Sequence, residues 1–406
     1  MTQTTDALEV FLHGEPVGML RKGKKHGSAT FQYYPDAPYA LSISMPVREL
    51  PYDPVITRNW FTGLLPEGER PNFLAKHFVV SLTDYVDLLR ETGLDCSGAV
   101  TFGSPSIVRS SSVIAATNFA EVVAALPEVH DGAESDSLRS IVAGFQPKTT
   151  ALRHIGWSIS NQYSMTTHIA KPEHERYPGL ADAEAWAMTV ASGVAKTAYV
   201  KVEDFNGIRT IIVTRFDRFV YDGEAHAVHQ EDFCQALGLS GDRKYATPGG
   251  NGKKGPSLVR LAALLKEHAD DPDRELQELV RQMTVNVVMG NTDWHAKNVG
   301  LIHDVNGRVS LAPLYDVVPV IHYIPKSLMS MSINSKFRPD RIYFHDLVSE
   351  AEHWGIDSET AECLVRSAVD GVAEGIAEAE TVYPLRPLGV LNFVTSQLRR
   401  FGAEGN

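Results

Sequence analysis

The strongest constraint on this chain is the segment "GNTDWHAKNVGLI", residues 290–302, in which charged and amide side chains follow an apolar stretch. The preceding residues, "LVRQMTVNVVM", are rich in apolar side chains, and polar groups at the end of such an element cost stability unless they are paired. Asp293 and Asn298 have the D-x-x-x-x-N spacing in which an Asp accepts the proton of an attacking hydroxyl and an Asn holds magnesium. The segment therefore predicts phosphoryl transfer, with Asp293 as the general base.

A second magnesium ligand is expected on a loop that faces the first. The residues after Asn298, "VGLIHDVNGRVSLAPLYDVV", predict two short strands joined by a turn at Asn306-Gly307, and Asp316 follows them. Magnesium prefers oxygen ligands and takes a few carboxylates together with phosphate oxygens, so Asn298 and Asp316 are chemically suitable. The plainer alternative is that Asp293 caps a helix and Asp316 ends a strand.

Upstream residues supply candidates for a phosphate site. Gly144 in "SIVAGFQPKTTALR" lies in a predicted tight turn, where backbone N–H groups can approach phosphate oxygens. Lys171 follows at the end of the apolar strand "MTTHIAKP", where it either contacts phosphates or extends its charged end to solvent. Glu184, on the next predicted helix, either pairs with Lys171 as in kinases or is a solvated charge. The strand "IRTIIVTRFDRF" then ends where a hinge would hold adenine.

Composition limits the class of protein. The length of 406 residues suffices for two or three domains. The formal charge of −12 argues against unaided binding to nucleic acid, which needs a basic surface. The three cysteines, which are far apart, form neither a disulfide framework nor a zinc pattern, so we expect a reducing, cytoplasmic location. No signal peptide is visible and no apolar run approaches the roughly 18 residues of a membrane span, so we expect no membrane association.

Periodicity predicts an α+β organisation. Residues 7–46 alternate as β structure, and a helical pattern from about 58 to 93 has Thr83 as a candidate N-cap and Gly93 as a candidate C-cap residue. Polar connectors then precede a hairpin and a strand at 138–170. Next come a helix at 181–196 and strands at 198–204 and 208–216. From about 228 the chain is mostly helical, interrupted by the glycine-rich loop 247–257.

The ordered motifs resemble the HipA family of toxin serine/threonine kinases. The resemblance covers roughly residues 7–400 and rests on these stretches: "GLLPEGERP", "GLDCSGAVTFG", "AGFQPKTTAL", "THIAKP", "RFDR", "QEDFCQALG", "KY…GG", "GNTDWHAKN" and "LYDVV". It implies a two-lobed, protein-kinase-like fold with an extra N-terminal β-rich subdomain and an all-helical C-terminal lobe. The corresponding boundaries are an N-terminal subdomain at 1–105, a kinase N-lobe at 106–225 and a helical C-lobe at 226–406.

The resemblance also implies an activity, cofactors and partners. It implies a kinase that uses ATP and magnesium, acts on a protein such as an aminoacyl-tRNA synthetase, and promotes dormancy. A helix-turn-helix antitoxin is the implied partner, and contact with DNA is expected only through it. Besides the base Asp293 and the metal ligands Asn298 and Asp316, the residues implied for the nucleotide site are Ala143, Gly144, Phe145, Gln146, Pro147, Lys148, Lys171, Thr214, Arg215, Phe216, His295, Ala296, Lys297, Asn298, Tyr315 and Asp316. His295 could instead be a packed core residue, and Lys297 a solvated charge.

Two departures from the family pattern matter. Family members that inactivate themselves carry a serine three residues before the loop glycine, where this chain has Ile141, with Ser140 one step earlier. A one-residue shift on a strand reverses the face of the side chain, so the same self-phosphorylation is not expected. The stretch "HDLVSEAEHW", where DNA-contacting members carry a basic pair, is acidic. Two alternatives stay open: a weak kinase fold that serves as corepressor, and a small-molecule kinase.

Overall fold

The computed structural model describes residues 6–66, 70–103, 120, 123, 148–153, 157–159, 165–173, 176–222, 224–247, 255–384 and 386–403. The chain divides into two compact units, and each takes residues from several parts of the sequence. The first unit comprises residues 1–172, 203–241 and 302–307, and the second comprises 173–202, 242–301 and 308–406. The three-part division expected from the sequence stays a prediction. No helix in the described part of the chain has the length and hydropathy of a bilayer span.

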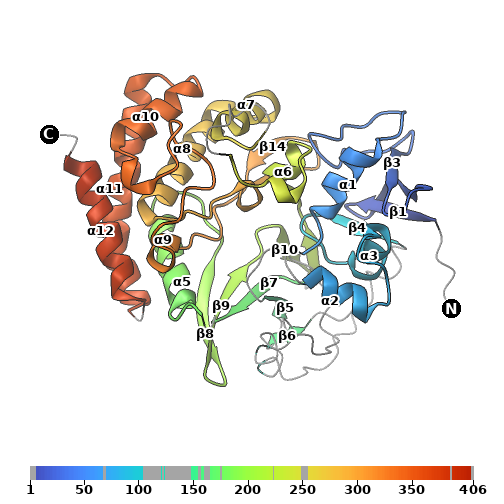
Figure 1. Ribbon diagram of the computed structural model, residues 1–406, viewed down its shortest axis with the longest axis horizontal. Coiled ribbons are helices and arrows are strands. Elements are labelled where there is room, and N and C mark those ends of the chain that lie inside the picture. Colours follow the sequence, from blue (N-terminus) through green and yellow to red (C-terminus); the bar gives the residue numbers. More distant parts are fainter. Residues whose placement is uncertain are drawn as a thin grey trace. The chain divides into compact units, whose positions relative to one another are not determined.

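The first unit begins with an antiparallel sheet in the order β3-β2-β1-β4, close to three helices (Figure 1). Large apolar side chains, among them Phe31, Trp60 and Phe61, form its core because alternate strand residues and one face of α1 point inward. The bounds are β1 (Ala7–Leu12), β2 (Glu15–Lys22), β3 (Ala29–Tyr33), α1 (Pro54–Thr62), α2 (Arg70–His77), α3 (Tyr85–Thr92) and β4 (Val100–Phe102).

A five-stranded sheet with the order β6-β5-β7-β9-β8 forms the next part of the first unit. Ala151, Ala170 and Ile212 from three of its strands are buried together. The bounds are β5 (Thr149–Arg153), β6 (Trp157–Ile159), β7 (His168–Pro172), β8 (Val200–Phe205) and β9 (Ile208–Thr214), followed by β10 (Arg218–Tyr221), β11 (Glu224–Ala227), β12 (His229–Asp232) and α6 (Phe233–Ala236). The boundary between the units falls within β8, whose first three residues, Val200–Val202, belong to the second unit.

The second unit is mainly helical. Its long helix α11 packs against α5, α8 and α10, and α8 also contacts α12. The bounds are α5 (Leu180–Ser192), η3 (Gly241–Arg243), α7 (Leu258–His268), α8 (Pro272–Met289), η4 (Ala296–Asn298), β13 (Gly300–His303), β14 (Val309–Leu311), α9 (Val320–Tyr323), η5 (Pro339–Arg341), α10 (Phe344–His353), α11 (Ser358–Val382) and α12 (Leu388–Ala403). The boundary between the units falls within η3 and within β13, so each of these lies partly in the first unit. The sequence-based fold class, an α+β protein of kinase-like organisation, is confirmed, and so is the hairpin around Asn306-Gly307.

Several local predictions were wrong. The stretch "YALSISM" is not a strand, because the Tyr33 hydroxyl accepts a hydrogen bond from Leu41 N (2.7 Å) and donates one to Met45 O (2.5 Å), which holds it as a loop. Asp84, not Thr83, caps α3, since its carboxylate accepts a hydrogen bond from Asp87 N. The region from about 228 is mostly helical, as expected, although it begins with the short strand β12, in which burial alternates along the residues.

Candidate active site

The predicted catalytic segment begins where α8 ends. Asp271 caps the start of this helix through Arg274 N, and Pro272 occupies its first turn, where a missing N–H costs nothing. Gly290 ends it in the left-handed conformation, at φ +67°. A Cβ at this position would lie 2.4 Å from Ile321 Cγ2 and 2.5 Å from Phe393 Cε1. Glycine is therefore required both by the backbone and by the neighbouring helices α9 and α12.

Hydrogen bonds on both sides hold the first residues of the segment. Asn291 Nδ2 donates to Asn286 Oδ1 on α8 (2.7 Å) and to the carbonyl oxygen of Asp316 (3.1 Å). The carbonyl of Thr292 accepts from Ser330 N and Ser330 Oγ, at 3.0 and 2.7 Å. Because all these groups are buried or half-buried, the bonds fix the position of the next residue, Asp293.

Asp293 is exposed, and the predicted role of general base requires that an external hydroxyl can reach it. Its carboxylate accepts a hydrogen bond from the Tyr245 hydroxyl (3.3 Å), and its main-chain carbonyl accepts one from Asn298 Nδ2 (3.0 Å). Asn298 thus uses its amide nitrogen within the segment, and its amide oxygen is the atom suited to a cation. The short helix η4 that follows begins after His295, so Asp293 is not its N-cap residue.

The middle of the segment is buried. Ala296 is fully buried and donates its N–H to the carbonyl of Lys244 (3.1 Å). Burial, with the positive charge of Lys244 adding to it, lowers the pKa of His295 to about 3, so its ring is neutral at neutral pH. His295 Nδ1 is buried and has no hydrogen-bond partner among the described residues. Lys297 is also buried, so the alternative of a solvated charge is wrong.

Tyr315 and Asp316 lie against the same segment. The Tyr315 hydroxyl donates to the carbonyl of Lys297 (2.9 Å), and Asn291 binds the carbonyl of Asp316. Asp316 has φ +59°, a left-handed conformation that non-glycine residues adopt rarely and often at functional sites. β14 ends at Leu311, so Asp316 lies on a loop and does not end a strand.

The residues present are suited to a magnesium ion whose coordination shell is completed by phosphate oxygens. Within the described residues, no three of His, Cys, Asp and Glu gather into a metal-binding group. The amide oxygen of Asn298 and the carboxylate of Asp316 are hard oxygen donors, and magnesium commonly takes one or two such side chains together with phosphates and water. Buried polar atoms usually have a hydrogen-bond partner, so the unpartnered Nδ1 of His295 is consistent with a polar ligand that binds next to this segment.

The first unit carries the other predicted nucleotide residues. The antiparallel register of β5 and β7 pairs Thr149 with Ala170; Lys148 directly precedes Thr149, and Lys171 directly follows Ala170 in β7. Both lysines are buried. The remaining phosphate-loop residues, Ala143, Gly144, Phe145, Gln146 and Pro147, lie outside the described residues, as do Ser140 and Ile141.

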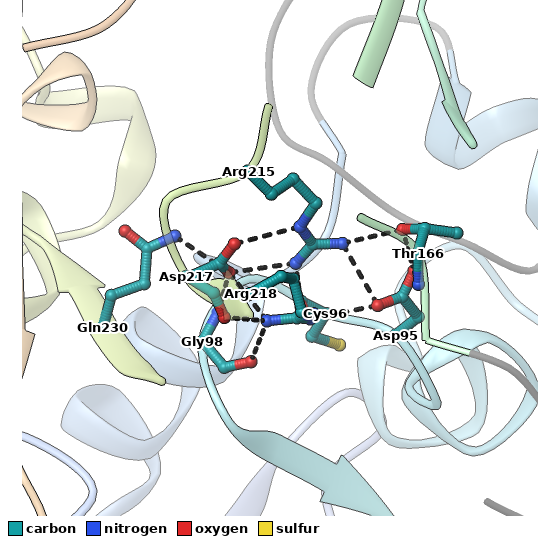
Figure 2. Close-up of polar contacts among 8 residues, drawn as sticks. All are labelled: Asp95, Cys96, Gly98, Thr166, Arg215, Asp217, Arg218 and Gln230. Atoms are coloured by element: carbon teal, nitrogen blue, oxygen red, sulfur yellow. Dashed lines mark hydrogen bonds and ion pairs between the residues drawn. The ribbon is translucent and has the colours of Figure 1, made fainter. Parts of the chain in front are cut away.

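The predicted hinge lies at the end of β9. Thr214 pairs with His168, and Arg215 donates its N–H to the carbonyl of Thr167 (3.0 Å). This N–H is therefore already bonded to protein. The Arg215 side chain is buried in a network of charged groups with Asp95, Asp217 and Arg218 (Figure 2).

The structure adds residues to the site that sequence reasoning did not assign. Tyr245 and Lys244 bond to the segment around Asp293, and the available signal was the "KY" in the family motif. Asp95, Asp217 and Arg218 belong to "GLDCSG" and "RFDR", which carried the resemblance but received no role. Glu184 is fully buried on α5, so the alternative of a solvated helix charge is wrong, and its pairing with Lys171 stays a prediction.

Comparisons with known proteins point in one direction. The family model described as "HipA N-terminal domain" matches residues 8–103, and the family model described as "HipA-like C-terminal domain" matches residues 140–376. The putative kinase Y4mE of Sinorhizobium fredii is 29% identical over 394 residues, which cover 92% of each chain. The serine/threonine-protein kinase toxin HipA of Shewanella oneidensis is 28% identical over 364 residues, covering 84% of this chain and 81% of the toxin.

A solved structure shares the fold. It is that of the Shewanella oneidensis MR-1 toxin–antitoxin system, with HipA, HipB and operator DNA in complex. One of its chains matches with a TM-score of 0.83 and 24% identity, covering 98% of this chain and 97% of that one.

Proposed function

The chain belongs to the HipA family, and on that basis we propose that it is an ATP- and magnesium-dependent serine/threonine-protein kinase, the toxin of a toxin–antitoxin pair. The observation that carries the proposal is the bonded arrangement of Asp293, Asn298 and Asp316 in the second unit. A base, an amide and a carboxylate held on neighbouring loops are the parts that phosphoryl transfer requires.

Each residue has a chemical role in this proposal. Asp293 accepts the proton of a serine or threonine hydroxyl on the substrate, and Tyr245 orients the Asp293 carboxylate. Asn298 and Asp316 hold the metal ion, which when bound neutralises charge on the phosphates. Lys148, Lys171 and the loop 143–147 bind the phosphates, and backbone groups of Thr214–Phe216 meet the adenine. His295, Ala296, Lys297 and Tyr315 complete the nucleotide site.

The proposed partners follow from the relatives and from charge. The Shewanella complex contains an antitoxin and operator DNA, and we infer a helix-turn-helix antitoxin here as well. The net charge of −12 and the acidic sequence of α10 support contact with DNA through that partner rather than directly. The substrate is proposed to be a cytoplasmic protein such as an aminoacyl-tRNA synthetase, and the free cysteines Cys96, Cys234 and Cys363 accord with that compartment.

The test is transfer of labelled phosphate from ATP in a host lysate, with identification of the labelled protein. Asp293→Asn should abolish transfer while nucleotide affinity is retained, because a base contributes little to holding ATP. Asp273→Asn, which changes an exposed carboxylate on α8, is the matched control and should transfer like wild type. Label found only on small alcohols would favour a small-molecule kinase, and binding without any transfer would favour a corepressor.

Metal-dependent nucleotide binding is tested separately by thermal stability. A ligand that binds only the folded state raises the free energy of unfolding by about 2.7 kcal/mol at a hundred times its Kd. Asp316→Asn should reduce the rise in Tm that MgATP gives to wild type, because a charged metal ligand is lost. An unchanged Tm of wild type in saturating MgATP would refute the kinase proposal.

A further inference from the structure

Four charged side chains are buried together in the first unit. They are Asp95, Arg215, Asp217 and Arg218, each less than 9% exposed, and their formal charges cancel. Figure 2 shows them converging from two stretches far apart in sequence, one shortly before β4 and one that runs from the end of β9 to the first residue of β10. Each stretch comes from a different family region, since the N-terminal domain covers 8–103 and the C-terminal domain covers 140–376.

The Arg215 guanidinium has every donor satisfied. Nε and Nη2 bind the two oxygens of Asp217 at 3.0 and 2.9 Å, and Nη2 also binds Cys96 O at 2.8 Å. Nη1 binds Asp95 Oδ1 at 3.1 Å and Thr166 Oγ1 at 3.0 Å. These five bonds use all five N–H groups of the side chain, so its position is fixed in every direction.

Arg218 and the two carboxylates complete the network. Arg218 donates to Asp95 Oδ1 (3.0 Å), Asp217 Oδ2 (2.9 Å) and Gly98 O (2.9 Å). Asp217 Oδ2 also accepts from Gly98 N at 2.7 Å. Gly98 has φ +78°, and a Cβ there would lie 2.7 Å from Gln230 O, so this close approach requires glycine. Although burial alone would raise it, the pKa of Asp217 is held far below its usual range by the two arginines.

A buried group of this kind is a poor source of net stability. Removing charges from water costs several kcal/mol per ion, and apolar side chains of similar volume often serve equally well. What the network does provide is geometry, because each bond restrains the turn Thr214–Arg218. That turn is also held by Arg215 N to Thr167 O and by Arg218 N to Arg215 O. It contains the residues assigned above to the adenine hinge.

We infer that Asp95 is a positioning residue for nucleotide binding, through which the N-terminal domain sets the conformation of the hinge at Thr214–Phe216. The inference rests on the proposed kinase function and extends it to a residue outside the nucleotide site. Asp95 binds Arg215, Arg218 and Thr166 at once, so its carboxylate joins the residues just before β7 to the turn that follows β9. The ligand whose recognition depends on it is the base of a nucleoside triphosphate.

The test compares Asp95→Asn with wild type by calorimetric titration with MgATP and with MgGTP. We expect affinity for MgATP to fall about tenfold, within the usual range of coupling between sites. The preference for ATP over GTP should fall as well, because the backbone groups of a displaced hinge would distinguish adenine from guanine less well. At saturating ATP, kcat should stay within about threefold of wild type, since the groups around Asp293 are unchanged.

The matched control is Glu231→Gln in the same unit. Glu231 is equally buried and also binds the N-terminal domain, through Ser42 Oγ and Ile43 N, but its carboxylate makes none of the bonds given above for the turn Thr214–Arg218. The variant Glu231→Gln should have a lower free energy of unfolding than wild type but the same preference for ATP over GTP. If Asp95→Asn fails to fold, the same titrations are made with Thr166→Val. This variant removes a hydroxyl bonded to Asp95 and Arg215 but keeps every charge of the network.

The outcomes separate this inference from the proposed function. A wild-type protein that binds no MgATP would overturn both. Wild-type binding together with unchanged affinity and ATP/GTP preference in the folded variant would overturn the positioning role and leave the kinase proposal intact. Equal changes in Asp95→Asn and Glu231→Gln would also overturn it, because the effect would then be general destabilisation.

Discussion

Replacing Gly290 with alanine adds only one methyl group, but it should lower the free energy of unfolding by several kcal/mol for two reasons. Gly290 has φ +67°, and an L-residue in the left-handed region costs about 1–2 kcal/mol. The added methyl would also lie 2.4 Å from Ile321 Cγ2 and 2.5 Å from Phe393 Cε1, and such overpacking costs about 1–3 kcal/mol. The two terms together predict a loss of about 2–5 kcal/mol in the free energy of unfolding.

Gly307→Ala is the control that separates the two terms. Gly307 has φ +77°, but no atom of the described residues lies within 4 Å of a Cβ built there, so only the backbone term applies. Urea denaturation followed by tryptophan fluorescence measures both variants, and Trp294 is buried within the affected segment. Because α8 ends at Gly290, phosphate transfer should fall in Gly290→Ala and stay near wild type in Gly307→Ala.

A second substitution tests whether the contact with α12 is the cause. Phe393→Leu removes the ring atoms that the new methyl would meet, so it should recover part of the stability lost in Gly290→Ala. A double-mutant cycle should give a favourable interaction energy of about 1–2 kcal/mol. If Gly290→Ala were no less stable than Gly307→Ala, or if the cycle gave no interaction, the packing argument would be refuted.

Three further outcomes are expected. Tyr245→Phe keeps the ring beside His295 but loses the hydroxyl bonded to Asp293, so kcat should fall about fivefold while the affinity for ATP is unchanged. If kcat and ATP affinity fell by the same factor, the role of Tyr245 would be structural. Burial and the nearby His303 lower the pKa of His229 from 6.5 to about 3, so the unfolded chain takes up this proton first as the pH falls. Stability should therefore drop by about 2 kcal/mol between pH 6.5 and 5, and His229→Gln should lose that slope in pH-dependent denaturation. Prolonged incubation with MgATP should leave Ser140 unmodified by peptide mass spectrometry, and stoichiometric phosphate there with loss of activity would contradict this expectation.

Short-range relations in this protein could be read from the sequence. Asp293 and Asn298 lie within one turn and a short helix, and the bond from Asn298 Nδ2 to Asp293 O joins residues five positions apart. The hairpin at Asn306-Gly307 likewise depends on neighbours in the chain. Steric limits on the backbone and the regular geometry of helices and strands act over such distances, so residue spacing was sufficient.

Long-range relations needed the tertiary structure. Tyr245 meets Asp293 across 48 positions, and Arg215 meets Asp95 across 120, and no periodicity connects residues so far apart. The sequence left open whether Lys171, Glu184 and Lys297 are solvated, and all three are buried. Whether a charge loses its water depends on which distant elements cover it, and the cost of that loss depends on which partners arrive with them. Residue type and local spacing therefore determined the chemistry available at the site, whereas packing decided which charged groups are buried and which distant residues position them.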